Sequence, residues 1–125
     1  MKKFKKEKIL WEEKDPFGRK IKLTSGAYRH IVKCHPREST FTEKMKETIK
    51  FPISIQEDEN IEEDAIKWYY FNRIEKEELN LIGVKNPYII LIVKKIRNEF
   101  RIVTCYACSD IKKKGAKEIW KREKD

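Results

Sequence analysis

The hydrophobic periodicity of this chain changes at Pro52, and that change constrains the fold more than any other feature. Before Pro52, apolar residues such as Ala27 and Ile31 recur with the spacing of an amphipathic helix. After it, the stretches 66–74 and 88–96 are rich in aromatic and β-branched residues, which favour strands. Helices that are separate in sequence from an antiparallel sheet define an α+β fold. The sequence therefore predicts an α+β protein.

Turn and helix-breaking residues divide the chain into expected elements. The tetrapeptide Asp15-Pro16-Phe17-Gly18 is typical of a tight turn and predicts an N-terminal β-hairpin. Pro36 ends the first helix, because the residue before a proline is driven out of the α region. We expect strands at 8–13 and 19–23, helices at about 25–35 and 42–50, and then an antiparallel meander sheet of about four strands at 53–55, 66–74, 88–96 and 100–108. An acidic loop is expected at 57–64, and the tail from Asp110 is predicted to hold a short final strand or helix. Residues 1–7 are predicted to be a basic tail, and 8–125 a single α+β domain.

Charge is the strongest compositional signal. The chain of 125 residues has 30 Lys and Arg against 21 Asp and Glu, a net charge of +9. Both ends of the chain are basic and the middle is acidic, so the two ends can form one basic face. Such a face favours a polyanion, and nucleic acid is the expected partner. The alternative is that a lysine-rich surface only keeps the protein in solution.

Several locations and chemistries are disfavoured. No run of 18 apolar residues is present, so we expect no membrane span. The three cysteines are an odd number, which fits a reducing cytoplasm better than secretion. Cys105 and Cys108 have redox spacing, but on a strand their side chains point to opposite faces, so we expect no disulfide between them. A zinc site formed by His30 and Cys34 with these two cysteines remains an alternative, although we favour a protein without a metal or another cofactor.

The only two histidines, His30 and His35, flank the end of the first expected helix. Pro36 excludes His35 from the helix, which lets its side chain return toward His30. Two imidazoles that titrate near neutrality can act as general base and general acid in RNA cleavage without a metal. The sequence does not say which histidine would be the acid. Three cations in the same segment are candidates for holding the phosphate: Arg29, Lys33 and Arg37.

The last long strand supplies hydroxyl groups. By simple alternation Ile102, Thr104, Tyr106 and Cys108 share one face, with the hydroxyls of Thr104 and Tyr106 about 7 Å apart. These hydroxyls could contact a phosphate or orient a base. On the strand at 66–74, Tyr70 and Arg73 are candidate substrate-binding residues, since either face of that strand could stack a base. The competing interpretation places these aromatic residues in the core.

The segment Tyr28-Arg29-His30-Ile31-Val32-Lys33-Cys34-His35-Pro36-Arg37-Glu38 resembles the "HI…xHPE" helix of phage-type BECR nucleases, the fold group of barnase, EndoU, colicin-type and RelE-like RNases. Pro52-Ile53-Ser54-Ile55 and Ile102-Val103-Thr104-Cys105-Tyr106 resemble two strands of the same group. Cys34 stands where an arginine is expected, and Glu38 lies one position late. The resemblance implies a metal-independent endoribonuclease with His30 and His35 near the site and Thr104 and Tyr106 across from them. It also implies toxin-like or phage-associated activity, with a protein antitoxin or inhibitor as a candidate partner.

The leading hypothesis is therefore a cytoplasmic ribonuclease that leaves a 2′,3′-cyclic phosphate. The alternative is a non-catalytic RNA-binding or partner-binding module on the same scaffold. The RNA target and the oligomeric state do not follow from the sequence.

Overall fold

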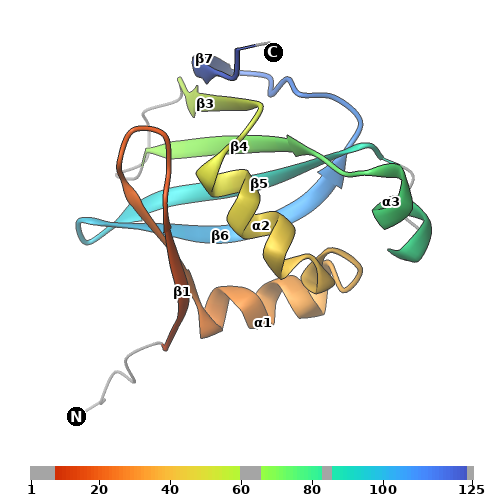
Figure 1. Cartoon of the computed structure of the whole chain (residues 1–125). Coiled ribbons are helices and arrows are strands. Elements are labelled where there is room, and N and C mark those ends of the chain that lie inside the picture. Colours follow the sequence, from red (N-terminus) through yellow and green to blue (C-terminus); the bar gives the residue numbers. More distant parts are fainter. Residues whose placement is uncertain (1–7, 60–65, 83–85, 124–125) are drawn as a thin grey trace.

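The structure is a computed structural model that describes residues 8–59, 66–82 and 86–123 (Figure 1). The expected basic tail at 1–7 and residues 60–64 of the expected acidic loop lie outside these ranges. The described elements, in chain order, are β1 (Ile9–Lys14), β2 (Lys20–Thr24), α1 (Ser25–Cys34), the short 3₁₀ helix η1 (Glu38–Thr40), α2 (Thr42–Lys50), β3 (Ser54–Asp58), β4 (Lys67–Arg73), α3 (Lys76–Ile82), β5 (Tyr88–Ile96), β6 (Glu99–Cys108) and β7 (Ala116–Lys121). The predicted α+β class is confirmed. None of the helices in these ranges is long and apolar enough to cross a membrane.

The described strands form one seven-stranded sheet with the order β1-β2-β6-β5-β4-β3-β7. Strands β3 to β6 are neighbours in chain order and antiparallel, but the sheet continues beyond them on both sides. The hairpin β1–β2 joins it through a parallel contact between β2 and β6, and β7 pairs with β3. The expectation of a purely antiparallel sheet of about four strands was therefore wrong in size and in this one pairing. Helix α3 was also not expected.

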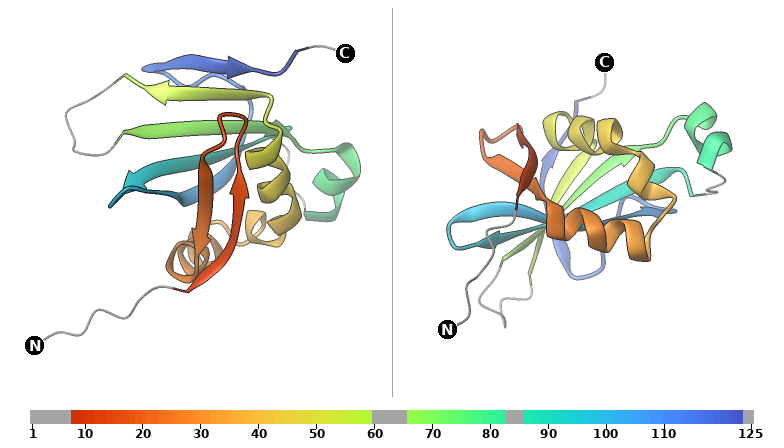
Figure 2. Two further views of the ribbon diagram at one scale, coloured as in Figure 1. Left: turned by 60° about the vertical axis from the view of Figure 1, so that its left-hand side comes forward. Right: turned by 90° about the horizontal axis from the view of Figure 1, so that it is seen from below.

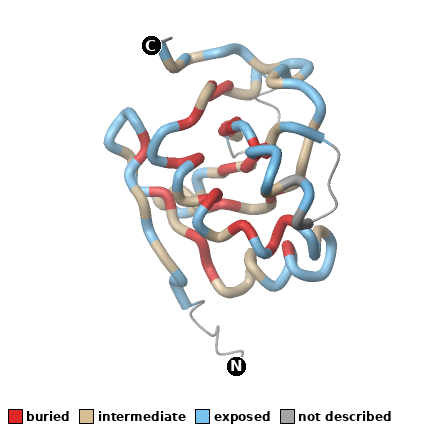
Figure 3. The backbone as a smooth tube through the Cα atoms, turned by 45° about the vertical axis from the view of Figure 1, so that its right-hand side comes forward, coloured by how far each residue is buried: buried red, intermediate tan, exposed pale blue. Residues whose placement is uncertain are grey.

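The hairpin joins the sheet because it carries buried apolar residues. Ile21 and Leu23 are fully buried and extend the main core, which lies between the sheet and the helices. An isolated two-stranded hairpin is marginally stable in water, so this packing is what holds it. Helices α1 and α2 lie on the same side of the sheet (Figure 2), and the buried positions follow the strands and the inner faces of these helices (Figure 3). The main core also includes Ile31, Met45, Ile49, Ile55, Tyr70, Ile89, Leu91 and Val93.

The opposite side of the sheet, called the second face here, has its own apolar cluster. Tyr69, Phe71 and Ile90 are buried there. The connection between β6 and β7 passes over this side, and its Ile111 packs on the cluster. The amide of Gln56 holds the connection in place, because its Nε2 donates to the carbonyl of Ile111 at 2.7 Å and its Oε1 accepts from the backbone of Lys113 at 3.0 Å.

Strand β6 does not alternate regularly. Ile92 pairs with Thr104 and Val93 pairs with Ile102, so Val103 is an extra residue in the ladder, a β-bulge. Ile102 therefore lies in the main core with Cys105 and not on the face of Thr104, as simple alternation predicted. After the bulge alternation is regular, and Tyr106 and Cys108 lie against the second-face cluster. The prediction that Cys105 and Cys108 point to opposite faces is confirmed, and both are free thiols.

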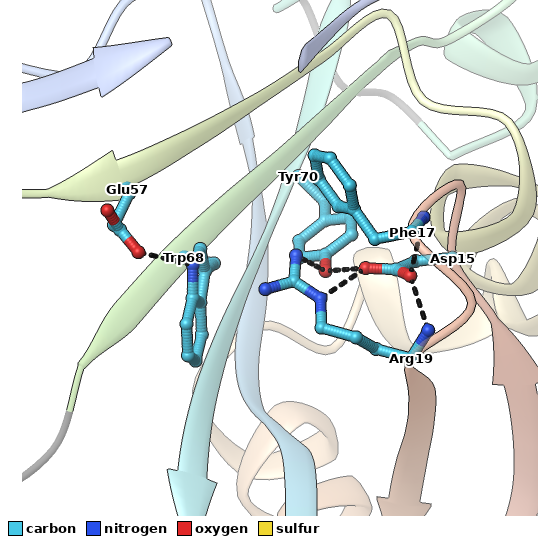
Figure 4. A network of polar contacts seen from close by, with 6 residues as sticks. All are labelled: Asp15, Phe17, Arg19, Glu57, Trp68 and Tyr70. Atoms are coloured by element: carbon cyan, nitrogen blue, oxygen red, sulfur yellow. Dashed lines mark hydrogen bonds and ion pairs between the residues drawn. The ribbon is translucent and has the colours of Figure 1, made fainter. Parts of the chain in front are cut away.

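A buried polar network fastens the tip of the hairpin to β4 (Figure 4). The side chain of Asp15 has no exposed surface, and it accepts hydrogen bonds from Arg19 Nε at 2.8 Å and from the hydroxyl of Tyr70 at 2.6 Å. Arg19 Nη2 donates to the same Tyr70 oxygen at 2.9 Å. The guanidinium also stacks against Phe17 and Trp68, with its central carbon 4.8 Å from each ring. Carboxylate and cation are thus paired and hydrogen-bonded, the condition under which charges are tolerated inside a protein.

Candidate active site

The end of helix α1 places the two histidines together. The hydroxyl of Thr24 caps the helix by accepting from the backbone of Ala27 at 3.3 Å. At the other end Pro36 terminates the helix, and His35 is the C-cap with φ −137° and ψ 62°. This change of backbone direction lets the ring of His35 approach that of His30, with centroids 6.3 Å apart and planes at 73°.

Tyr106 on β6 adjoins the histidines. Its ring centroid lies 5.6 Å from that of His35, with the planes tilted by 32°. Beyond its short contact with β2, strand β6 has a free edge on which α1 and η1 lie. The structure therefore brings together three of the predicted catalytic residues: His30, His35 and Tyr106.

Glu38 fixes the position of His35 against the strand. Its Oε2 accepts a hydrogen bond from the backbone N–H of Ala107 at 3.3 Å and lies 3.8 Å from Nδ1 of His35. Glu38 is largely buried. The carboxylate of Glu38 thus pairs with the backbone N–H of Ala107 on the edge of β6. It also attracts the imidazole of His35 when the imidazole is protonated.

Lys113, on the loop between β6 and β7, is a further residue of the candidate site that the sequence did not indicate. Its Nζ lies 3.4 Å from the hydroxyl of Tyr106 and 5.5 Å from the centroid of the Tyr69 ring. Gln56 positions the loop that carries Lys113, so the contact depends on an anchor 57 residues away in the sequence. Within a run of three lysines at 112–114, no sequence signal distinguishes the one that faces the site.

The other predicted site residues lie at varied distances from this group. Arg29 and Lys33 are exposed on α1, and Arg37 is exposed just after it, so these cations belong to the same segment as the histidines. The Oγ1 of Thr104 is buried without a hydrogen-bond partner within the described part of the chain, so it is not presented at the surface. Tyr70 lies in the main core, and its hydroxyl is occupied by Asp15 and Arg19. Arg73 is exposed at the end of β4, opposite Tyr88 on β5.

The thiols differ in environment. Cys34 is exposed, with its Sγ 3.7 Å from Nδ1 of His30. Burial, together with the charge of Glu38, raises the pKa of the Cys105 thiol to about 12. Burial also raises the pKa of Cys108 to about 11. Among the described residues no group of three His, Cys, Asp or Glu side chains is arranged to hold a metal ion.

Tyr69 lies beneath the site on the second face. Its hydroxyl donates to Asp58 Oδ2 at 2.7 Å, and burial and this hydrogen bond raise its pKa far above the usual value for tyrosine. Tyr69 therefore stays a neutral donor, and of the two tyrosines near Lys113 it is Tyr106 whose hydroxyl the ammonium contacts.

The arrangement has the parts that phosphodiester cleavage requires. A proton donor or acceptor works at hydrogen-bond distance, about 2.6–3.2 Å, from the atom it serves. Two imidazoles with centroids 6.3 Å apart can therefore contact oxygens of the same phosphate. The ammonium of Lys113 and the hydroxyl of Tyr106 stand beside that position as groups able to stabilise negative charge.

Comparisons of this chain with protein-family profiles, with curated proteins and with solved structures gave no match. The functional argument therefore rests on the geometry of the site.

Proposed function

We propose that this protein is a metal-independent endoribonuclease that cleaves RNA to a 2′,3′-cyclic phosphate. The observation that carries the proposal is the convergence of His30, His35 and Tyr106, which come from the second half of α1, its C-cap and strand β6. A positioned carboxylate at Glu38 and a cation at Lys113 accompany them.

Each group has a role in the proposed reaction. One imidazole removes the proton from the 2′-hydroxyl, which attacks the adjacent phosphorus. The other imidazole protonates the 5′ oxygen that leaves. Lys113 and the Tyr106 hydroxyl stabilise the added negative charge on the phosphorane, and Glu38 holds His35 in place. Arg29, Lys33 and Arg37 attract the flanking phosphates.

The arrangement of elements supports the likeness to the BECR nucleases that the sequence motifs suggest. Two helices precede four consecutive antiparallel strands and pack on one side of them. The "HI…xHPE"-like segment provides the histidines, and the last of these four strands provides Tyr106. A cytoplasmic ribonuclease of this kind would need an inhibitor protein, because unrestrained cleavage damages the RNA of the host cell.

The test is incubation of the purified protein with total RNA in the presence of EDTA. We expect cleavage products that end in a 2′,3′-cyclic phosphate. A variant with His30→Ala and His35→Ala should lose at least about 10²–10⁴-fold in rate, the usual contribution of general acid–base catalysis. The matched control is Lys46→Gln with Lys50→Gln on α2, away from the histidines, which should cleave like the unmodified protein.

Two results would contradict the proposal. Full activity in the double histidine variant would exclude the imidazole mechanism. Binding of RNA without any cleavage by the unmodified protein would favour the non-catalytic RNA-binding module.

A further inference from the structure

A row of basic side chains crosses the sheet on the second face, the face of Tyr106. Lys67 on β4 pairs with Lys94 on β5, Lys94 pairs with Arg101 on β6, and Arg101 pairs with Lys22 on β2. We call these four residues the cationic row. Neighbouring strands are about 4.8 Å apart, so the row extends about 14 Å across the sheet.

The β-bulge at Val103 puts this row on the same face as Tyr106 of the candidate active site. Ile102 lies in the main core, so Arg101 points to the other side, as Thr104 and Tyr106 do. With unbroken alternation, Arg101 and Tyr106 would lie on opposite faces. The bulge therefore gives one surface both the basic residues and Tyr106.

Such a row is unfavourable for the protein alone. Like charges that are directly opposite on neighbouring strands destabilise a sheet. Lys22 and Arg101 have a partner in Glu99, whose carboxylate lies 3.1 Å from Lys22 Nζ and 2.7 Å from Arg101 Nη2. These contacts hold the pKa of Glu99 below its usual value. Lys67 and Lys94, in contrast, have no ion pair with any residue of the described ranges.

Glu99 lies within the row, between Lys22 and Arg101, and two further acidic residues of the described ranges lie near its ends. Glu12 is 3.8 Å from Lys22 at one end. At the other end, Asp58 is the last residue of β3, the strand next to β4, and it accepts a hydrogen bond from the hydroxyl of Tyr69. Lys94 lies between Lys67 and Arg101 in the row, and a bound anion beside it would offset its repulsion with these neighbours.

We propose that the cationic row binds the phosphate backbone of a single RNA strand a few nucleotides away from the scissile phosphate. This inference rests on the proposed function, since it assigns the substrate path to that site. The partners of Arg101 and Tyr106 on β5, Lys94 and Ile90, are four positions apart, so the two residues lie about 13 Å apart along the sheet. The row therefore contacts phosphates a few nucleotides away from the one at the histidines.

A single strand fits this path because the surface between row and site is partly apolar. Ile92 and Thr104 lie there as a pair, and the ring of Tyr106 follows. An unpaired base can stack on such a surface while its phosphate reaches a lysine.

The experiment compares two substrates and two double variants. The substrates are a dinucleoside monophosphate, which occupies only the histidine site, and a 2′-O-methyl single strand of about 12 nucleotides, which binds without being cleaved. Lys67→Gln with Lys94→Gln should weaken binding of the long strand about tenfold at low salt. It should also lower the slope of log affinity against log salt by about 1.4, because each phosphate contact contributes about 0.7. Cleavage of the dinucleoside monophosphate should not change.

The matched control is again Lys46→Gln with Lys50→Gln, the same change in charge on the helix side of the sheet. Equal loss of affinity in both double variants would contradict the proposal that the cationic row binds RNA. Tighter binding of an RNA duplex than of the single strand would contradict it as well. Lys94→Arg, which keeps the charge, should retain the affinity. The row variant should melt no lower than the unmodified protein, because it removes a repulsion.

The two proposals fail separately. If the unmodified protein does not cleave the dinucleoside monophosphate but the row variant still loses affinity for the long strand, the ribonuclease proposal fails and the cationic row remains supported as a binding site. If cleavage of the dinucleoside monophosphate depends on the histidines but affinity for the long strand is unchanged in the row variant, only the proposal that the cationic row binds RNA fails.

Discussion

Tyr106 is the residue at which the two halves of the candidate site meet. Its ring faces His35 from the helix side, and its hydroxyl faces Lys113 from the loop between β6 and β7. Any displacement of β6 would therefore alter both contacts. Glu38 opposes such displacement, because it holds both the backbone of Ala107 and the ring of His35.

We expect Tyr106→Phe to lower kcat about 10²-fold, with a smaller effect on KM. The change removes a hydroxyl that would act on charge formed only in the transition state, while the ring stays against His35. Single-turnover cleavage of a fluorescent RNA measures the effect. Tyr88→Phe on the neighbouring strand is the control and should retain full activity. Equal kcat in Tyr106→Phe and the unmodified protein would remove this hydroxyl from the mechanism.

At the scale of elements, local sequence signals were sufficient where the structure is local. The turn at Asp15–Gly18, the break at Pro36 and the two helices all lie where the sequence placed them. The parallel contact between β2 and β6 could not be predicted, because it joins residues about 80 positions apart through the burial of Ile21 and Leu23. The bulge at Val103 was missed for a similar reason, since the register of β6 is set by its partner β5.

Contacts between residues distant in the sequence also limited the prediction of the candidate site. His30, His35 and Tyr106 were found because the chemistry of a residue type can be recognised in a sequence. Lys113 was missed because only the hydrogen bonds of Gln56 select it from its neighbours. Tyr70 was included as a substrate-binding candidate because its strand alternates, and only its partner Asp15 shows that it faces the core.

The hairpin should depend on its buried ion pair. Asp15→Asn removes the negative charge that pairs with Arg19 and replaces one of the two acceptor oxygens with an NH2 donor, and breaking a buried pair in this way costs about 3 kcal/mol or more. Chemical denaturation should show that loss in the free energy of unfolding. Glu13→Gln on β1 makes the same chemical change at a partly exposed position and should cost less than about 0.5 kcal/mol. A loss below about 1 kcal/mol for Asp15→Asn would show that the network does not hold the hairpin.

At the scale of the whole molecule, the two faces of the sheet carry different kinds of residues. The helix side buries the main core, and the second face carries Tyr106 and the cationic row beside a smaller apolar cluster. The loop from β6 to β7 covers part of that cluster and at the same time delivers Lys113. The basic ends of the chain, predicted to combine on one surface, contribute Lys22, Lys94 and Arg101 to the row, and the acidic middle contributes Lys67.

Both faces also bury groups that resist ionisation, and this predicts how the protein unfolds in alkali. The Cys105 thiol has a pKa of about 12 in the folded protein, against 9.0 for the exposed group. Between those values the unfolded chain releases a proton that the folded chain keeps, so the free energy of unfolding falls as pH rises. The contribution is complete below about pH 9 and decreases by about 1.4 kcal/mol per pH unit above it. Cys108 acts in the same direction, and Tyr69 and Tyr70, whose pKa values are also raised by burial, add to the loss at higher pH.

Urea denaturation under reducing conditions at pH 8, 9 and 10 measures this dependence. Cys105→Ala should be less stable at pH 8, because it leaves a cavity in the main core, but its stability should fall less steeply between pH 9 and 10. Cys34→Ala, which removes an exposed thiol, should have the slope of the unmodified protein. A stability that stays constant from pH 8 to 10, or a slope that Cys105→Ala does not change, would contradict the burial of this thiol and with it the packing of β6 against the helices.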